Sequence, residues 1–186
     1  MRNVQAIAVL AALALSGCNT QLQVPPWAGG GGGAVAPEPG IVAPDTGAAP
    51  VAYTITQSEG QQIPGRVLAQ VNSLRAGSGL APLMLSPQLS AAAAVHSRDM
   101  AGQNRAWHWG SDGSSPAERA QRQGFYGHVL GENISESYEN DMQTLNAWMQ
   151  VRDTRDIIMD PTATQLGFAW YQEDTRKIWW TLLTGR

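Results

Sequence analysis

The chain has 186 residues, 43% of them hydrophobic and 15% charged, which suits one globular domain with a real core and leaves little room for a second. Its formal net charge is -3 at pH 7, and its sequence pI is near 5.5. Lysine and arginine are scattered along the chain, with no basic stripe, so we expect no nucleic-acid partner.

The first residues indicate export. Arg2 precedes an apolar run from Val4 to Leu15, which is shorter than the about 20 residues that a helix needs to span a bilayer. We therefore predict a signal peptide over residues 1–17. The Leu-Ser-Gly-Cys sequence that ends at Cys18 resembles the lipobox of bacterial lipoproteins, which implies cleavage before Cys18 and its acylation, for example by palmitate. A plain secretory signal with an accidental cysteine is the alternative.

Cys18 is the only cysteine, so the exported domain has no disulfide and depends on packing for its stability. Asn19 follows it where an aspartate would signal retention in the inner membrane of lipoprotein-sorting bacteria. We therefore predict an extracytoplasmic, lipid-anchored monomer, with the outer membrane or cell surface favoured over the inner membrane.

The segment over residues 18–63 has the composition of a tether. It contains five consecutive glycines, Gly29–Gly33, followed by several prolines, and it cannot bury enough apolar surface to offset its ordering entropy. Near its end, the alternation of Val51–Gln57 predicts a short strand on the domain edge. The organised domain is predicted over residues 64–186.

Helices dominate the first half of this domain. Apolar residues recur at helical spacing from Val67 to Leu74, and Gly77 and Gly79 end that segment. Ser86 and Pro87 form an N-cap and an N1 proline for an alanine-rich helix. A capping box over residues 115–118 opens a short helix that stops at Gly124.

In the second half of the domain, the spacing of apolar residues changes from helical to alternating. His128–Ser135 is expected to form a brief strand, Asp141 to cap a helix that carries Trp148, and residues 153–161 to add another helical turn. Two alternating segments over residues 164–172 and 178–184 then predict a β-hairpin with a polar turn. The expected fold class is α+β, an antiparallel sheet covered by helices.

The order of several short motifs resembles the CAP superfamily: cysteine-rich secretory proteins, antigen 5, pathogenesis-related 1 proteins and bacterial SCP-like extracellular proteins. The motifs are HSRDMA from His96, HWGSDGSSPAERA from His108, GENIS from Gly131, Trp148, IIMDPTATQLGFAW from Ile157 and the terminal IWW segment. The resemblance covers roughly residues 65–186. It implies an α-β-α sandwich with a shallow cleft that holds up to four polar side chains, two histidines and two acids.

Only half of that tetrad is present. The resemblance places His108 and Glu132 at the first two positions, and Val151 and Thr154 at the other two. In relatives that bind a divalent metal, the two histidines are the ligands, whereas zinc generally requires three or four protein donors. We expect no metal and no cofactor unless His128 or Asp153 supplies a further ligand.

His108 and Glu132 remain the candidate catalytic pair, because a carboxylate bonded to one imidazole nitrogen fixes the histidine tautomer and raises its basicity. The nearby serines have structural explanations as turn, cap or strand residues, and no G-x-S-x-G elbow exists; these are Ser111, Ser114, Ser115 and Ser135. His96 lies on an apolar helical stripe and is expected to pack with one hydrogen bond, and His128 has no assigned role.

The tryptophans allow two interpretations. They could form a sugar-stacking platform, or they could supply core area to a domain without disulfides. We expect Trp107 and Trp109 to wedge their loop against the sheet, and Trp179 and Trp180 to face opposite sides of a strand.

These observations favour a binding module at the cell envelope for a lipid or glycan-type ligand. The alternative is a hydrolase that acts on a peptide or envelope polymer through His108 and Glu132. Enzymatic activity is therefore left open, with binding favoured.

Overall fold

The computed structural model describes residues 53–186. The predicted signal peptide, the predicted acylation site at Cys18 and most of the predicted tether lie outside these residues. The elements follow in the order α1 (Gln57–Gly77), β1 (Met84–Leu85), α2 (Pro87–Gln103), α3 (Pro116–Arg122), β2 (Val129–Ser137), α4 (Asp141–Gln150), α5 (Arg152–Ile158), β3 (Gln165–Gln172) and β4 (Ile178–Gly185). None of the helices in this part of the chain has both the length and the apolar character needed to cross a membrane.

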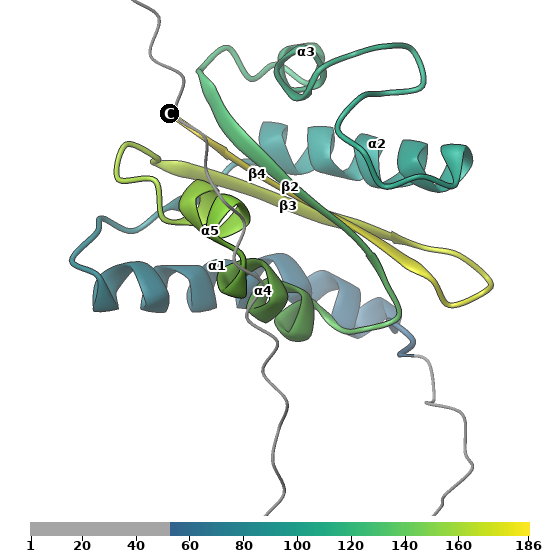
Figure 1. Cartoon of the computed structure of the whole chain (residues 1–186), viewed down its shortest axis with the longest axis horizontal. Helices are drawn as coiled ribbons and strands as arrows, with labels where there is room; N and C mark the ends of the chain where they lie inside the picture. Colours follow the sequence, from purple (N-terminus) through teal and green to yellow (C-terminus); the bar gives the residue numbers. More distant parts are fainter. Residues whose placement is uncertain (1–52) are drawn as a thin grey trace, which may run out of the picture. The chain divides into compact units, whose positions relative to one another are not determined.

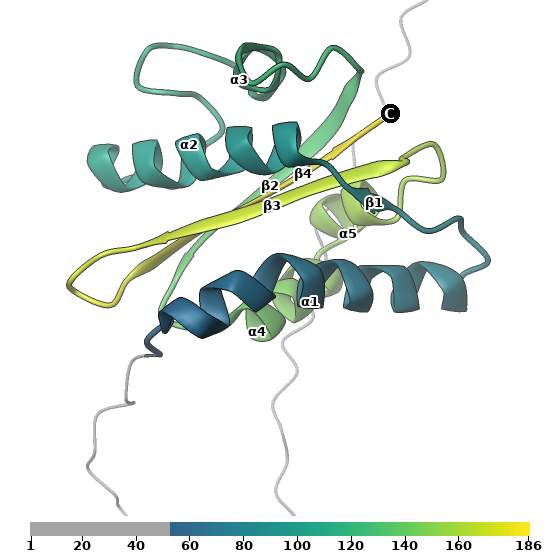
Figure 2. The same ribbon diagram turned by 180° about the vertical axis from the view of Figure 1, so that it is seen from behind.

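A central sheet lies between two layers of helices (Figures 1 and 2). Helices α2 and α3 cover one face, and α1, α4 and α5 cover the other. Every position of the last strand, β4, is buried, because helices cover both faces of the sheet. Trp180 and Leu182 enter the core beside α1 and α4, whereas Leu183 enters the core beside α2. The predicted α+β sandwich is confirmed.

The sheet is not wholly antiparallel, which corrects the sequence prediction. Its strand order is β1-β3-β4-β2, and β1 pairs with β3 in parallel. The sequence did not indicate β1, because it has only two residues, Met84 and Leu85, and both are exposed. The β3–β4 hairpin is antiparallel as predicted.

The prediction of a strand over Val51–Gln57 is wrong within the described residues. Thr56 is instead the N-cap of α1 and forms a capping box with Glu59, in which Glu59 N donates to Thr56 Oγ1 over 3.3 Å. The helix therefore crosses the predicted domain boundary at residue 63, and Ile63 is fully buried. Pro64 lies inside the helix, and it obscured the helical pattern upstream of it.

Side-chain caps determine where the other helices begin. Ser86 caps α2 and Ser115 caps α3, both followed by an N1 proline as predicted. The cap of α4 is Asn140, whose Oδ1 accepts from Gln143 N over 2.9 Å, and not the predicted Asp141. Asn140 and Gln143 form a local capping box, and Asp141 is the first residue of the helix, where it is buried and forms a bidentate ion pair with Arg66 of α1.

Gly167 allows β3 to approach α2 closely. A Cβ atom there would lie 2.2 Å from the carbonyl carbon of Leu89, a distance that no side chain tolerates. This contact brings α2 down onto the sheet and so positions the loop that follows it.

Candidate functional site

The candidate site lies between strand β2 and the helical layer of α2 and α3. Glu132 on β2 pairs across the sheet with Leu183 of β4, and directly opposed residues share a face. Since Leu183 packs in the α2–α3 core, the Glu132 side chain also enters that layer. The loop between α2 and α3 carries His108 over the same position.

The structure brings the two predicted residues together. His108 Nδ1 lies 2.9 Å from Glu132 Oε1. The Glu132 side chain is 1% exposed and that of His108 is 54% exposed, so the acid is buried and the imidazole reaches the surface. The contact engages Nδ1 of the His108 ring, whereas Nε2 of the same ring has no partner among the described residues.

A buried arginine that the sequence analysis did not identify completes the carboxylate's environment. Arg119 Nη2 donates to Glu132 Oε2 over 2.7 Å, and Arg119 Nη1 donates to the carbonyls of Ser114 and His108 over 2.7 and 3.1 Å. Arg119 thus ties the loop, α3 and β2 together. The spacing of residues in α3 does not distinguish Arg119 from Arg122, an exposed arginine three residues later on a similar side of the same helix. The sequence therefore could not show which of the two is buried.

His96 is a packing histidine, as predicted, but it also borders the site. It is fully buried, and its Nε2 donates to the Trp107 carbonyl over 2.9 Å. The same nitrogen lies 3.6 Å from Glu132 Oε1, and Nδ1 has no partner in the described chain. Burial lowers the pKa of His96 below 6.5, against the opposing effect of the Glu132 carboxylate.

This lowered pKa predicts acid destabilisation. The unfolded chain binds a proton at His96 as pH falls through about 6.5, while the folded protein resists it until lower pH, so the free energy of unfolding decreases across that window. We expect His96→Gln, whose amide can still donate to Trp107, to reduce the pH dependence measured by urea unfolding above and below pH of about 6.5. His128→Gln, at an exposed histidine, serves as the control. If the free energy of unfolding changes with pH as steeply in His96→Gln as in the unmodified protein, this assignment is wrong.

The other two family positions do not supply ligands. Val151 is exposed, and the Thr154 hydroxyl donates to the Trp148 carbonyl over 2.6 Å. Asn133, the neighbour of Glu132 on the opposite face of β2, donates to the Thr154 carbonyl over 2.8 Å. Over residues 53–186, no three histidine, cysteine or acidic side chains converge to hold a metal ion. Glu132 is already paired with Arg119. His108 and Glu132 therefore do not supply the three or four donors that a divalent metal such as zinc requires.

Two of the candidate nucleophiles are engaged elsewhere: Ser115 caps α3, and Ser111 Oγ donates to Asp99 over 2.6 Å. Ser114 is buried, with its carbonyl accepting from Arg119, and Ser135 lies on β2. No serine hydroxyl of the described chain bonds to His108. His128 acts through its backbone, which pairs with Arg186 at the end of the sheet.

The tryptophans have mixed roles. Trp179 and Trp180 are both buried on opposite sides of β4, as predicted. Trp107 is half-buried, with its indole N–H on Gln103 and Arg105 above its ring. Trp109 is 52% exposed, which corrects the expectation that it wedges the loop against the sheet. Arg119 and Asp99 hold that loop instead.

A groove between α1 and α4 is a second candidate site. Its apolar lining comes from Leu74 of α1 and from Met142, Leu145 and Met149 of α4. Polar amides also line it: Gln70, Asn146 and Gln150. Its volume is about 430 Å³, within the usual range for small-molecule sites. We call it the α1–α4 groove.

Comparison with known proteins identifies the family. The model of the cysteine-rich secretory protein family, CAP, matches residues 68–183. The chain belongs to the CAP family. The match covers α2, α3 and the whole GENIS strand, so the His108–Glu132 contact lies within the CAP domain.

Bacterial proteins are among those that this chain resembles. YkwD of Bacillus subtilis is 27% identical over 121 residues, which cover 65% of this chain and 46% of YkwD. The chain therefore spans less than half of that relative's length. A solved extracellular protein with an SCP domain from Bacillus anthracis superposes with a TM-score of 0.61 at 23% identity, covering 72% of this chain and 45% of that protein. An outer surface protein from Borrelia burgdorferi gives a TM-score of 0.59 at 14% identity and covers 73% and 98%.

Proposed function

We propose that this CAP-domain protein is an extracytoplasmic binding module that takes up an acyl chain of an envelope lipid in the α1–α4 groove, while an acylated Cys18 holds it to the membrane. The observation that carries the proposal is the open groove between α1 and α4, whose lining combines apolar side chains with amides, on the face of the sheet opposite the His108–Glu132 contact (Figure 1). The extracellular and outer-surface descriptions of the structural neighbours support the location.

The groove suits a flexible apolar chain. Met142 and Met149 are half-buried, and methionine side chains adapt to ligands of varied shape because they are unbranched and polarisable. Leu145 is buried at the base of the groove. An apolar base with amides along the rim is typical of sites that bury a hydrocarbon and leave a polar head in water.

The polar site is less suited to turnover. Both oxygens of Glu132 are engaged, one by His108 and the other by Arg119, and the described chain offers His108 no hydroxyl nucleophile. A carboxylate between an arginine and a histidine stabilises a fold well. These features favour binding over hydrolysis.

The groove is tested by replacing Met142 and Met149 together with glutamine, which keeps side-chain length and removes apolar character. We expect the affinity for a fluorescent fatty acid, measured by titration of the full chain, to fall about tenfold or more as apolar contact is lost. Met84→Gln, at a 67% exposed methionine on β1, is the matched control and should bind normally. Equal binding by all three proteins would reject the groove as the lipid site.

The anchor is tested separately. We expect Cys18→Ala to move the exported protein from the membrane fraction to the soluble fraction, because a protein with no acyl chain loses the buried methylene groups that hold it, each worth about 0.8 kcal/mol. Fractionation and mass spectrometry of the N-terminal peptide provide the measurement. Retention of the variant in the membrane would show that something other than Cys18 anchors the chain.

A hydrolase remains the second candidate because His108 presents a free Nε2 at the surface while Glu132 holds Nδ1, the arrangement of an oriented general base. His108→Ala separates the two functions. If the unmodified protein hydrolyses a peptide or envelope polymer and this variant loses that activity while it binds the fatty acid normally, the protein is a hydrolase and the binding module alone does not account for its function.

A further inference from the structure

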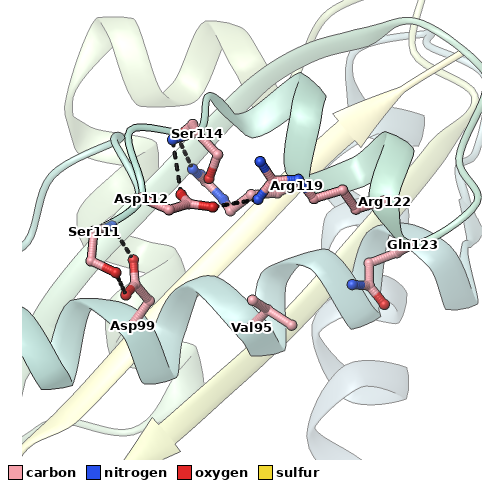
Figure 3. A pocket seen from close by; sticks show the side chains of 8 residues that line it. All are labelled: Val95, Asp99, Ser111, Asp112, Ser114, Arg119, Arg122 and Gln123. Carbon is pink, nitrogen blue, oxygen red and sulfur yellow. Dashed lines mark hydrogen bonds and ion pairs between the residues drawn. The ribbon is translucent and has the colours of Figure 1, made fainter.

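A further pocket lies on the outer side of Arg119, between α2 and the segment that leads into α3 (Figure 3). It has a volume of about 190 Å³, which is below the usual range for drug-sized ligands and fits one ring or one residue. Its lining includes Val95, Asp99, Asp112, Arg119, Arg122 and Gln123. We call it the α2–α3 pocket.

The walls of this pocket are held in place before any ligand binds. Asp99 accepts from Ser111 N over 2.7 Å and from Ser111 Oγ over 2.6 Å. Asp112 accepts from Ser114 N over 2.9 Å and pairs with Arg122. Hydrogen bonds from Ser114 and Arg122 hold the pKa of the Asp112 carboxyl far below its ordinary value, so this acid is ionised at neutral pH.

The pocket retains unused hydrogen-bonding capacity of both kinds. An ionised carboxylate has about four acceptor sites, and the bonds to Ser114 and Arg122 use two of those at Asp112. On the donor side, Arg119 is 3% exposed, and its Nε has no partner among the described residues. Arg122 and the Gln123 amide add further N–H groups, and Val95 adds an apolar surface.

The charge balance selects among ligands. Arg119 is paired with Glu132 and Arg122 with Asp112, while Asp99 forms no ion pair with a residue that lines the pocket. The pocket therefore has no net positive charge to attract phosphate or sulfate. Adjacent carboxylate acceptors and guanidinium donors instead match neighbouring hydroxyl groups, each of which both donates and accepts.

We infer that the α2–α3 pocket binds a single neutral sugar ring, with Asp112 and Arg122 on adjacent hydroxyls and Val95 against the ring face. This site is separate from the α1–α4 groove and does not depend on the proposed lipid binding. It gives the CAP domain a carbohydrate contact on the helical layer that carries His108.

Saturation-transfer NMR on the full chain in detergent micelles tests the inference. The probes are methyl glucoside and N-acetylglucosamine, with cyclohexanol as an apolar ring and ethanolamine as a cation. We expect transfer to the sugars, and a loss of affinity of about tenfold in Asp112→Asn, as for removal of one charge-assisted hydrogen bond. Glu139→Gln makes the same chemical change at an exposed acid outside the pocket and should bind like the unmodified protein.

A second variant guards against a folding defect. Val95→Phe fills the pocket from an exposed position on α2 without removing a hydrogen bond, so it should abolish sugar transfer at an unchanged melting temperature. Sugar signals no stronger than those of cyclohexanol, or signals that survive Val95→Phe, would overturn the inference. Saturation of ethanolamine in place of the sugars would assign the pocket to cations and overturn it as well.

Discussion

Glu132→Ala is expected to lower the free energy of unfolding by about 3 to 5 kcal/mol, the usual cost of removing one partner from a buried ion pair. The variant leaves the guanidinium of Arg119 buried and opposite no charge, since Arg119 is 3% exposed. It also releases His108, whose ring nitrogen is held by Glu132. For a domain of this size, the melting temperature should fall by roughly 10 to 15 °C.

The control for this variant lies on the same strand. Glu136→Ala removes a 40% exposed carboxylate paired with Lys177, and such pairs contribute about 0 to 1 kcal/mol. Urea unfolding of both variants provides the measurement. If Glu132→Ala and Glu136→Ala lower the free energy of unfolding by the same amount, the buried network around Glu132 does not stabilise the fold, and the site geometry described above is wrong.

Arg75→Met is the second large effect, with an expected cost of about 4 kcal/mol, because several buried acceptors lose a charged donor together. Arg75 is fully buried at the end of α1. Its guanidinium donates to the carbonyls of Ala81, Ile158, Asp160 and Ala163, over 2.8, 2.9, 2.9 and 3.3 Å. These bonds join α1 to the last residue of α5 and to the segments that precede β1 and β3.

A lysine should not restore this stability, because an ammonium group has three donors and lacks the planar fork that reaches several carbonyls. Arg98→Met, at an exposed arginine that lies over Tyr171, is the matched control and should cost less than about 1 kcal/mol. Calorimetry and urea unfolding would both report the difference. A loss in Arg75→Met as small as that in Arg98→Met would contradict the role assigned to Arg75.

Parts of the fold could be predicted because they depend on residues close together in the chain. Ser86 and Ser115 cap helices through hydrogen bonds to residues three positions later, and a capping box is therefore visible in the sequence. The β3–β4 hairpin follows from alternation and a polar turn. The pairing of His108 with Glu132 was predicted only through the CAP resemblance, since the two residues lie 24 positions apart.

Other features depend on contacts that no local pattern contains. The ion pair between Asp141 and Arg66 joins α4 to a helix 75 positions earlier in the chain. The two-residue β1 has no periodicity to detect. Both features arise from segments that meet only in the folded chain, Arg66 with Asp141 and β1 with β3.

The sequence by itself determined the types of most elements, the beginnings of α2 and α3 and the CAP resemblance, because capping and periodicity act within a few residues. Only the tertiary structure decided which charged side chains are buried. Arg119 and Arg75 resemble any helical arginine in the sequence, and their roles arise from the acceptors that distant segments bring to them. A buried charge is stable only with such partners, so its position is a property of the packed fold.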